Sequence, residues 1–177
     1  MDHEELISSA RLSIWLDHYD DIFSDFDSRT ITERALSDDF IHEARKMLKE
    51  KPNGQVELKL LVPEGLRNSE TEKVVILSVH RQFNRFANVI KIEMKRIRKQ
   101  GYLMCSIGFA LMIAATYIGS FSNKMFYVTA LQVIIEPAGW FLTWTGFDNI
   151  FANMRKRSPE LDFNEKMAQS EIIFLSI

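Results

Sequence analysis

Two long apolar runs constrain the fold of this chain more than any other feature. Residues 102–121 are 20 residues without a charge, and residues 125–147 are 23 residues with one charge, Glu136. A helix of either length spans about 30 Å, the thickness of the hydrocarbon core of a bilayer. Burying both in a soluble core needs a large surrounding domain, which 177 residues cannot easily supply. The sequence therefore predicts a transmembrane helical hairpin with a polar turn at residues 122–124.

Basic residues flank the two runs on their outer sides. They are Lys95, Arg96, Arg98 and Lys99 before the first run, and Arg155, Lys156 and Arg157 after the second. The turn holds Lys124 alone, so the positive-inside rule predicts an integral protein of the cytoplasmic membrane with both termini cytoplasmic. We expect the flanking basic residues to contact anionic lipid headgroups, and Trp140 and Trp144 to anchor the second span at the interface. Because residues 1–20 hold no apolar run, we expect no cleavable signal peptide.

The residues outside the hairpin predict a small cytoplasmic α+β domain. Residues 11–17 and 56–62 alternate apolar and polar side chains, which is the period of a strand. Ser37 is a suitable N-cap for a helix over 38–49, and residues 172–177 predict a strand that returns to the sheet. We thus expect an α+β membrane protein with a sheet of two or three strands. Its parts are a domain over 1–100, a hairpin over 101–148 and a cytoplasmic tail over 149–177.

A long helical pattern links the domain to the first span. From about Glu70, apolar residues recur every three or four positions, and no helix breaker intervenes before Gly101. This predicts one helix that leaves the domain and enters the membrane. Its apolar stripe either covers the sheet or forms a seam with a neighbouring subunit.

The thin sheet predicts self-association, and the small residues of the first span predict close helix packing. A sheet of two or three strands has exposed edges, and such edges seek partners. In the first span, Ser106, Ala110 and Ala114 repeat every four residues, and Ala115 and Gly119 form a second such pair. Small residues at this spacing predict a helix-packing face. We therefore expect a homo-oligomer, with other membrane proteins as further potential partners.

Several stretches resemble a family of uncharacterised small bacterial two-span membrane proteins with an N-terminal α+β cytoplasmic domain. The resemblance lies in residues 22–28, which are rich in Phe, Ser and Asp, and in Thr32-Glu33-Arg34-Ala35-Leu36-Ser37-Asp38-Asp39-Phe40-Ile41, Val79-His80-Arg81-Gln82-Phe83 and Gly139-Trp140-x-x-x-Trp144. The chain departs from the family at Thr145-Gly146, where Arg-Pro is usual. The resemblance implies a fold, a two-span topology and the bacterial inner membrane, and it implies no activity.

The acidic segment 17–27 and the histidines are the potential metal ligands. Asp17, Asp20, Asp21, Asp25 and Asp27 could bind a hard cation, although they lack the spacing and central glycine of a calcium loop. The alternative, which we favour, is a solvated loop whose acids meet the basic helix of the same or a neighbouring chain. None of the four histidines pairs with another at helical spacing, so we expect no metal and no other cofactor.

Glu136 is the most informative single residue. It falls near the middle of the second span and is followed by Pro137, which removes one helical hydrogen bond. A carboxylate at this depth costs at least about 2.5 kcal/mol unless it faces protein or water. It therefore lines an ion or proton path, or hydrogen-bonds a neighbouring helix in its protonated form, or marks a re-entrant kink together with Pro137.

The sequence contains none of the common catalytic motifs, so we do not predict an enzyme. It has no nucleophile elbow, phosphate loop or dinucleotide motif, and its one cysteine, Cys105, lies within the first span. A net charge of -2 does not favour nucleic acid as a partner. We predict a non-enzymatic, self-assembling membrane scaffold or interaction protein. The alternative is an oligomeric ion or proton conduit that uses Glu136.

Overall fold

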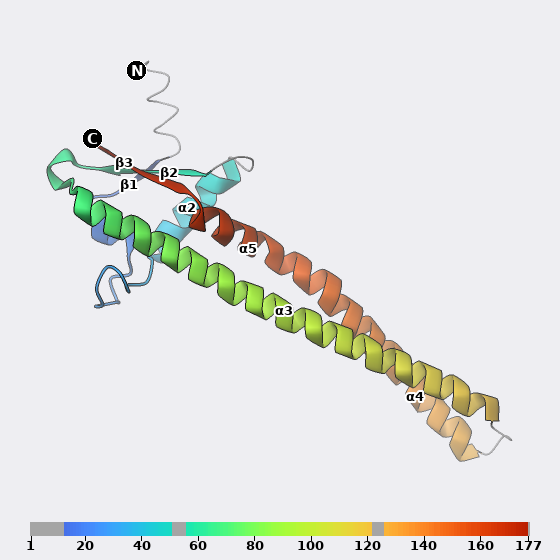
Figure 1. Ribbon diagram of the computed structural model, residues 1–177. Helices are drawn as coiled ribbons and strands as arrows, with labels where there is room; N and C mark the ends of the chain where they lie inside the picture. The colour runs from blue at the N-terminus through green and yellow to red at the C-terminus, as the bar shows by residue number, and fades with distance from the viewer. Residues whose placement is uncertain (1–12, 51–55, 122–125, 177) are drawn as a thin grey trace. The chain divides into compact units, whose positions relative to one another are not determined.

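The computed structural model of the protein describes residues 13–50, 56–121 and 126–176 (Figure 1). The chain forms two compact units, one of Met1–Asn88 with Leu161–Ile177 and the other of Val89–Glu160. In chain order the elements are β1 (Ser13–Trp15), a 3-10 turn (Tyr19–Ile22), α2 (Asp38–Glu50), β2 (Glu57–Val62), a 3-10 turn (Glu64–Leu66), α3 (Ser69–Phe121), α4 (Phe126–Asp148), a π-helical turn (Asn149–Asn153), α5 (Met154–Ala168) and β3 (Glu171–Ser176). The predicted mixed α+β class, with a small sheet and two long apolar helices, is confirmed.

The first unit is built on a three-stranded sheet in which all strands are parallel. The order is β1-β2-β3, with Ile14 beside Leu60 and Leu60 beside Phe174. The last strand of the sequence thus returns to the sheet as predicted, although residue 177 of the predicted 172–177 lies outside the described residues. β2 occupies the centre, so β1 and β3 are the two edges.

β1 is shorter than the predicted strand over 11–17, of which residues 11 and 12 lie outside the described ranges. The Leu16 N–H still donates to the Leu61 carbonyl at 2.9 Å, and then the chain turns away from the sheet. The turn is fixed by the Asp21 carboxylate, which accepts a hydrogen bond from the His18 N–H at 2.8 Å. An acidic side chain that caps the following 3-10 turn therefore ends the strand.

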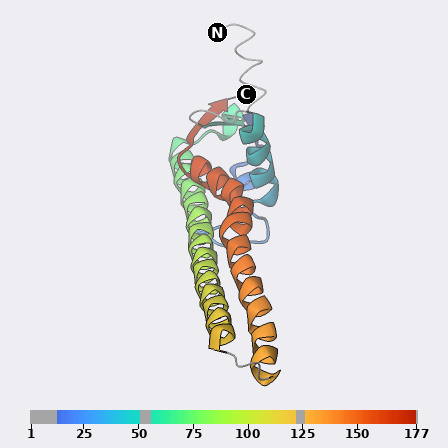
Figure 2. The same cartoon turned by 90° about the vertical axis from the view of Figure 1, so that its right-hand side faces the viewer.

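All three helices of the first unit cover the same face of the sheet (Figures 1 and 2). Alternate residues of β2 and β3 point into this core, which also takes Phe40 and Ala44 from α2 and Phe163 and Met167 from α5. The buried apolar residues of the core are Leu16, Ile22, Phe23, Leu36, Phe40, Ala44, Leu58, Leu60, Val62, Val75, Val79, Phe83, Phe163, Met167, Ile172 and Phe174. Their burial from water is the main force that holds the unit together.

The long helix α3 begins in this core and is continuous through Gly101, as predicted. Asn68 caps it, because the Asn68 side-chain oxygen accepts hydrogen bonds from the Glu70 and Thr71 N–H groups. Val79 and Phe83 of the predicted stripe are fully buried in the core. Val79 and Phe83 thus cover the sheet, as the first of the two readings expects, and a seam with a neighbouring subunit stays a prediction.

Two contacts establish the direction of α3 relative to the sheet. Arg67, just before α3, donates to Ser176 Oγ at the end of β3 at 3.0 Å. Twelve positions from Asn68, and well into α3, the His80 Nε2 atom lies 2.9 Å from the Ser170 carbonyl oxygen, just before β3. Moving forward along α3 therefore corresponds to moving backward along β3, so α3 runs antiparallel to the strands.

A polar cluster fastens the start of α3 to the 3-10 turn after β1. Arg67 donates two hydrogen bonds to the buried Glu72 carboxylate, at 2.5 Å and 3.1 Å, and the Tyr19 hydroxyl donates a third at 3.0 Å. The hydrogen bonds from Arg67 hold the pKa of Glu72 below its ordinary value. Ionised Glu72 is thus part of the folded structure of the first unit.

This cluster predicts a pH dependence of stability. Because the folded-state pKa of Glu72 is lowered, its contribution is present above the unfolded pKa of about 4.3 and is lost as the pH falls through the folded value. We expect Glu72→Gln to destabilise the protein by about 1.5–3 kcal/mol at pH 7, with the difference from wild type shrinking as the pH falls below about 4. Urea unfolding at a series of pH values measures this. Glu70→Gln, one half-turn earlier and exposed, is the control and should change little.

Candidate functional site

In the second unit, α3 and α4 pack through their glycines. A Cβ atom added to Gly146 would lie 2.7 Å from the Gly101 carbonyl oxygen, and one added to Gly108 would lie 2.6 Å from the Gly139 carbonyl oxygen. Both distances are shorter than real Cβ contacts, so only glycine fits at these positions. The backbones of the two helices are therefore in direct contact, as in close-packed membrane helices.

The contact residues form a regular seam. On α3 the contact runs through Gly101, Cys105, Gly108 and Met112, and it reaches Gly119, where an added Cβ would meet the Gln132 side chain at 2.8 Å. On α4 it runs through Gln132, Gly139, Thr143 and Gly146. Cys105 Sγ donates to the Thr143 carbonyl oxygen at 3.6 Å, and Thr143 Oγ1 donates to the Gly139 carbonyl oxygen at 2.8 Å. Cys105 and Thr143 are thus paired within the two helices, and we call these contact residues the hairpin seam.

The predicted packing face does not coincide with this seam. Ser106, Ala110 and Ala114 are exposed, whereas Ala115 is buried and Gly119 lies in the seam. The Ser106 hydroxyl donates to the Tyr102 carbonyl oxygen of its own helix at 2.9 Å. The prediction followed a strict four-residue spacing, whereas the seam alternates steps of four and three residues. A role for the exposed three residues in packing against another chain stays a prediction.

Glu136 and Pro137 lie on the exposed surface of α4. The helix runs from Phe126 to Asp148 with Pro137 inside it. Glu136 falls four residues after Gln132 and three before Gly139, which is the spacing of the seam. Within the described ranges, no hydrogen bond or ion pair to the Glu136 carboxyl group is found.

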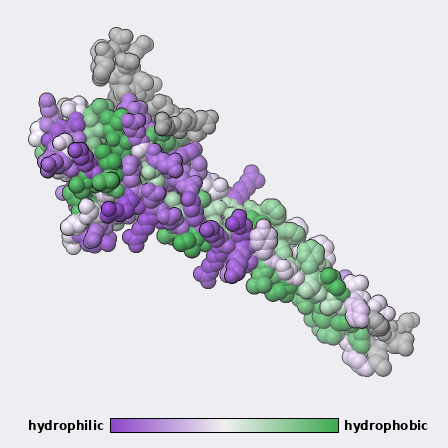
Figure 3. All heavy atoms as spheres, in the orientation of Figure 1, coloured by the Kyte–Doolittle hydropathy of each residue, from purple (hydrophilic) through white to green (hydrophobic). Residues whose placement is uncertain are grey.

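Large apolar side chains cover the rest of the hairpin surface. On the face seen in Figure 3, green predominates along the hairpin of the second unit. Trp140 and Trp144, the predicted interface anchors, are 60% and 68% exposed, and Ile113 and Phe141 are 69% and 70% exposed. The two helices are long and apolar enough to cross a membrane. Such a surface needs an apolar environment or a partner.

The two groups of basic residues lie at the same end of the hairpin. Arg157 pairs with Glu93 at 3.6 Å, and thereby links the segment after α4 to the segment of α3 that holds the first group. Arg157 also pairs with Glu160 at 3.1 Å. The predicted headgroup residues Lys95, Arg96, Arg98, Lys99, Arg155, Lys156 and Arg157 are all exposed.

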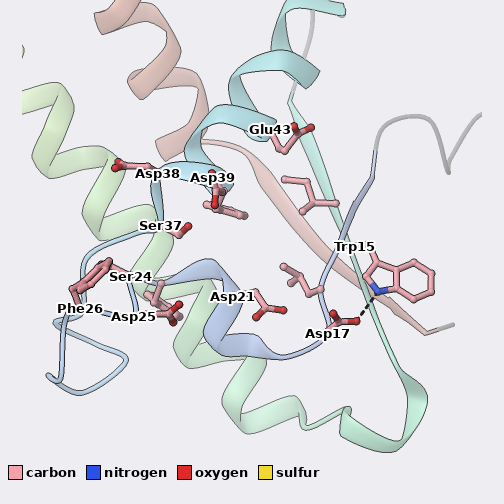
Figure 4. A pocket seen from close by; sticks show the side chains of 14 residues that line it. Trp15, Asp17, Asp21, Ser24, Asp25, Phe26, Ser37, Asp38, Asp39 and Glu43 are labelled. Carbon is pink, nitrogen blue, oxygen red and sulfur yellow. Dashed lines mark hydrogen bonds between the residues drawn. The ribbon is translucent and has the colours of Figure 1, made fainter.

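The first unit carries an acidic pocket of about 660 Å³ between β1, the loop after it and the start of α2 (Figure 4). Six carboxylates line it, from Asp17, Asp21, Asp25, Asp38, Asp39 and Glu43. Trp15 and Phe26, at its rim, are 61% and 101% exposed. The pocket combines negative charge with exposed aromatic rings.

The aspartates of the acidic segment pair with arginines of their own loop. Asp20 pairs with Arg34 at 2.8 Å, and Asp27 pairs with Arg29 at 2.7 Å. Hydrogen bonds from Arg29 hold the pKa of Asp27 well below its ordinary value. The expectation that these acids meet a basic helix is wrong for Asp20 and Asp27, because Arg29 and Arg34 are closer in sequence. Among the described residues, no three potential metal ligands gather at one point.

Sequence reasoning missed the seam and the pocket for different reasons. The seam has a readable signal, since Gly101 and Gly108 are seven residues apart, as are Gly139 and Gly146. The pocket has none, because it depends on how the loop after β1 folds against α2.

Comparisons of the chain with protein-family models, with curated proteins and with solved structures found no match. The resemblance to bacterial two-span membrane proteins therefore stays a prediction.

Proposed function

We propose that this protein is a non-enzymatic, self-assembling membrane scaffold. Its hairpin crosses the bacterial inner membrane, and its α+β unit faces the cytoplasm together with both termini. The exposed apolar surface of α3 and α4 supports insertion, and the basic residues gathered at one end of the hairpin support this orientation. Its partners are the bilayer, through anionic headgroups, and further copies of itself.

Glu136 carries the proposal of self-assembly. It is exposed on an apolar helix and has no partner within the described part of its own chain. In a bilayer an exposed carboxyl group costs at least about 2.5 kcal/mol, and a neighbouring helix that hydrogen-bonds it removes much of this cost. A second copy supplies such a helix, including its own Glu136 and Gln132.

Substitution of Glu136 tests this proposal. We expect Glu136→Gln to assemble like wild type, because an amide still forms hydrogen bonds between helices. Glu136→Leu removes an interaction worth about 1–2 kcal/mol and should weaken assembly about tenfold. Fluorescence energy transfer between labelled copies in liposomes measures the association, with Val133→Leu as the control at an exposed apolar position of the same helix. Equal association of wild type and Glu136→Leu would contradict the proposal.

The same residue supports a second candidate, an oligomeric ion or proton conduit. In a conduit, Glu136 carboxylates of several copies surround one path and exchange protons or cations. Glu136→Gln then abolishes flux into liposomes while leaving association intact. A scaffold shows no flux in either wild type or variant.

A further inference from the structure

The end of the hairpin that carries the basic residues is strongly positive. Residues 91–99 and 155–157, all in the second unit, hold eight bases and one acid, Glu93. Glu93 pairs with Arg157 at 3.6 Å, and Arg157 also pairs with Glu160 at 3.1 Å. Because one acid cannot neutralise eight bases, this surface favours an anion from outside the chain.

Helix geometry divides these bases between two sides of the hairpin. Glu93 and Arg157 come from the two facing segments, so their ion pair marks one side. Successive residues of an α-helix are rotated by about 100°. On α3, Lys95 and Arg98 are therefore turned about 200° and 140° from Glu93. On α5, Arg155 is turned about 200° from Arg157. Lys95, Arg98 and Arg155 thus lie together on the opposite side.

These three cations are close together and unpaired. Among the residues that the structure describes, no ion pair to Lys95, Arg98 or Arg155 is found, and all three are exposed. The backbones between them are in contact, because a Cβ atom added to Gly101 would lie 2.9 Å from the Gly146 carbonyl oxygen. The helix axes here are thus near the lower limit of about 8 Å for packed helices. One bound molecule can therefore reach bases on both segments.

Each of the two arginines has an exposed aromatic ring one helical turn deeper in the hairpin. Tyr102 follows Arg98 by four residues, and Phe151 precedes Arg155 by four, a spacing that places side chains on one face. Both rings are exposed, and Phe151 stacks on Phe147 with ring centroids 6.2 Å apart. A cation beside an exposed ring suits a phospholipid, whose phosphate meets the cation and whose apolar part meets the ring.

We infer that this side of the hairpin binds a phospholipid with two phosphate groups in one headgroup, the cardiolipin class. The inference names the lipid for the membrane protein proposed above and rests on that proposal. Arg98 and Arg155 each donate paired hydrogen bonds to one phosphate, and Lys95 adds a point charge. Basic groups between neighbouring membrane helices, on the cytoplasmic side, are suited to such headgroups. The rings favour a lipid over a soluble phosphate, which would leave them exposed.

Titration of the full chain in detergent with cardiolipin, followed by native mass spectrometry, tests the inference. We expect Arg98→Gln and Arg155→Gln each to bind cardiolipin about tenfold more weakly, because each loses charge-assisted hydrogen bonds to one phosphate. The matched control is Arg96→Gln, which removes the same charge from the same helix. Arg96 is exposed but turned only about 60° from Glu93, so this variant should bind like wild type.

Three results would overturn the inference. Equal loss of cardiolipin binding in Arg96→Gln and Arg98→Gln would show that any positive charge at this end suffices. Phosphatidylglycerol has one phosphate, and its binding to wild type as tightly as cardiolipin, at equal phosphate concentration, would exclude a site for two phosphates. Inorganic pyrophosphate bound as tightly as cardiolipin would exclude a lipid as the specific ligand.

The membrane proposal has a separate readout. Alkaline extraction of liposomes that contain the full chain leaves a spanning protein in the membrane pellet. A wild-type chain that is released by this treatment overturns the membrane proposal and the lipid site together. A chain that stays in the pellet but shows no preference for cardiolipin overturns the lipid site alone.

Discussion

We expect Gly108→Val to separate α3 from α4. A Cβ atom at this position would meet the Thr143 side chain and lie 2.6 Å from the Gly139 carbonyl oxygen, and neither neighbour is the far end of a flexible side chain. The two backbones must therefore move apart, and the contacts of the whole seam weaken with them. Overpacking of a well-packed interior costs about 1–3 kcal/mol, and a rigid backbone contact belongs at the upper end of that range.

Unfolding of the hairpin by added SDS, followed by the fluorescence of Trp140 and Trp144, measures this loss. The matched control is Ala110→Val, two residues further along the same helix but exposed. The control should unfold at the same SDS fraction as wild type. Equal destabilisation by both substitutions would show that the seam is not where the structure has it. Ala110→Val could also keep the SDS stability of wild type and yet associate more weakly. That result would place the predicted small-residue face at a contact between chains.

Phe83→Ala should unfold much of the first unit. The Phe83 side chain is fully buried, and its ring packs edge-to-face on Phe163 of α5 with centroids 5.7 Å apart. It thus joins α3 to a helix that lies far away in sequence. Truncating a buried phenylalanine to alanine typically costs about 3–5 kcal/mol, because both the transfer free energy and the filled volume are lost.

Hydrogen exchange of the β2 amides detects this effect, because β2 is the centre of the sheet. A loss of about 3 kcal/mol raises exchange through global unfolding by roughly a hundredfold. Leu77→Ala serves as the control, since Leu77 lies on the same helix but is 64% exposed. Similar exchange rates in the two variants would contradict the position of Phe83 in the core.

The elements that the sequence predicted well are those with long, regular patterns. The apolar period from Glu70 onward and the absence of a breaker predicted α3, alternation predicted β2, and the apolar run over 172–177 predicted β3. The length of β1 was overestimated, because the 3-10 turn that ends it depends on a cap from Asp21 to His18. Caps of this kind involve single residues and leave no periodic trace in the sequence.

The candidate site was less accessible from the sequence. Glu136 could be singled out from the sequence, because the cost of its carboxyl group depends only on its position in the apolar run, and the structure places it on the exposed surface of α4. The predicted helix-packing face includes Ser106, Ala110 and Ala114, which are exposed and lie outside the hairpin seam. Choosing between two stripes of small residues requires knowing which face of α3 meets α4, and that is a tertiary property.

The mass of the intact assembly tests the account most directly. Native mass spectrometry of the full chain, released from a mild membrane mimetic, counts copies without any substitution. We predict a mass of at least twice the 20.6 kDa of one chain, with bound anionic lipid. A mass of 20.6 kDa alone, at protein concentrations where the chain remains folded, would contradict self-assembly.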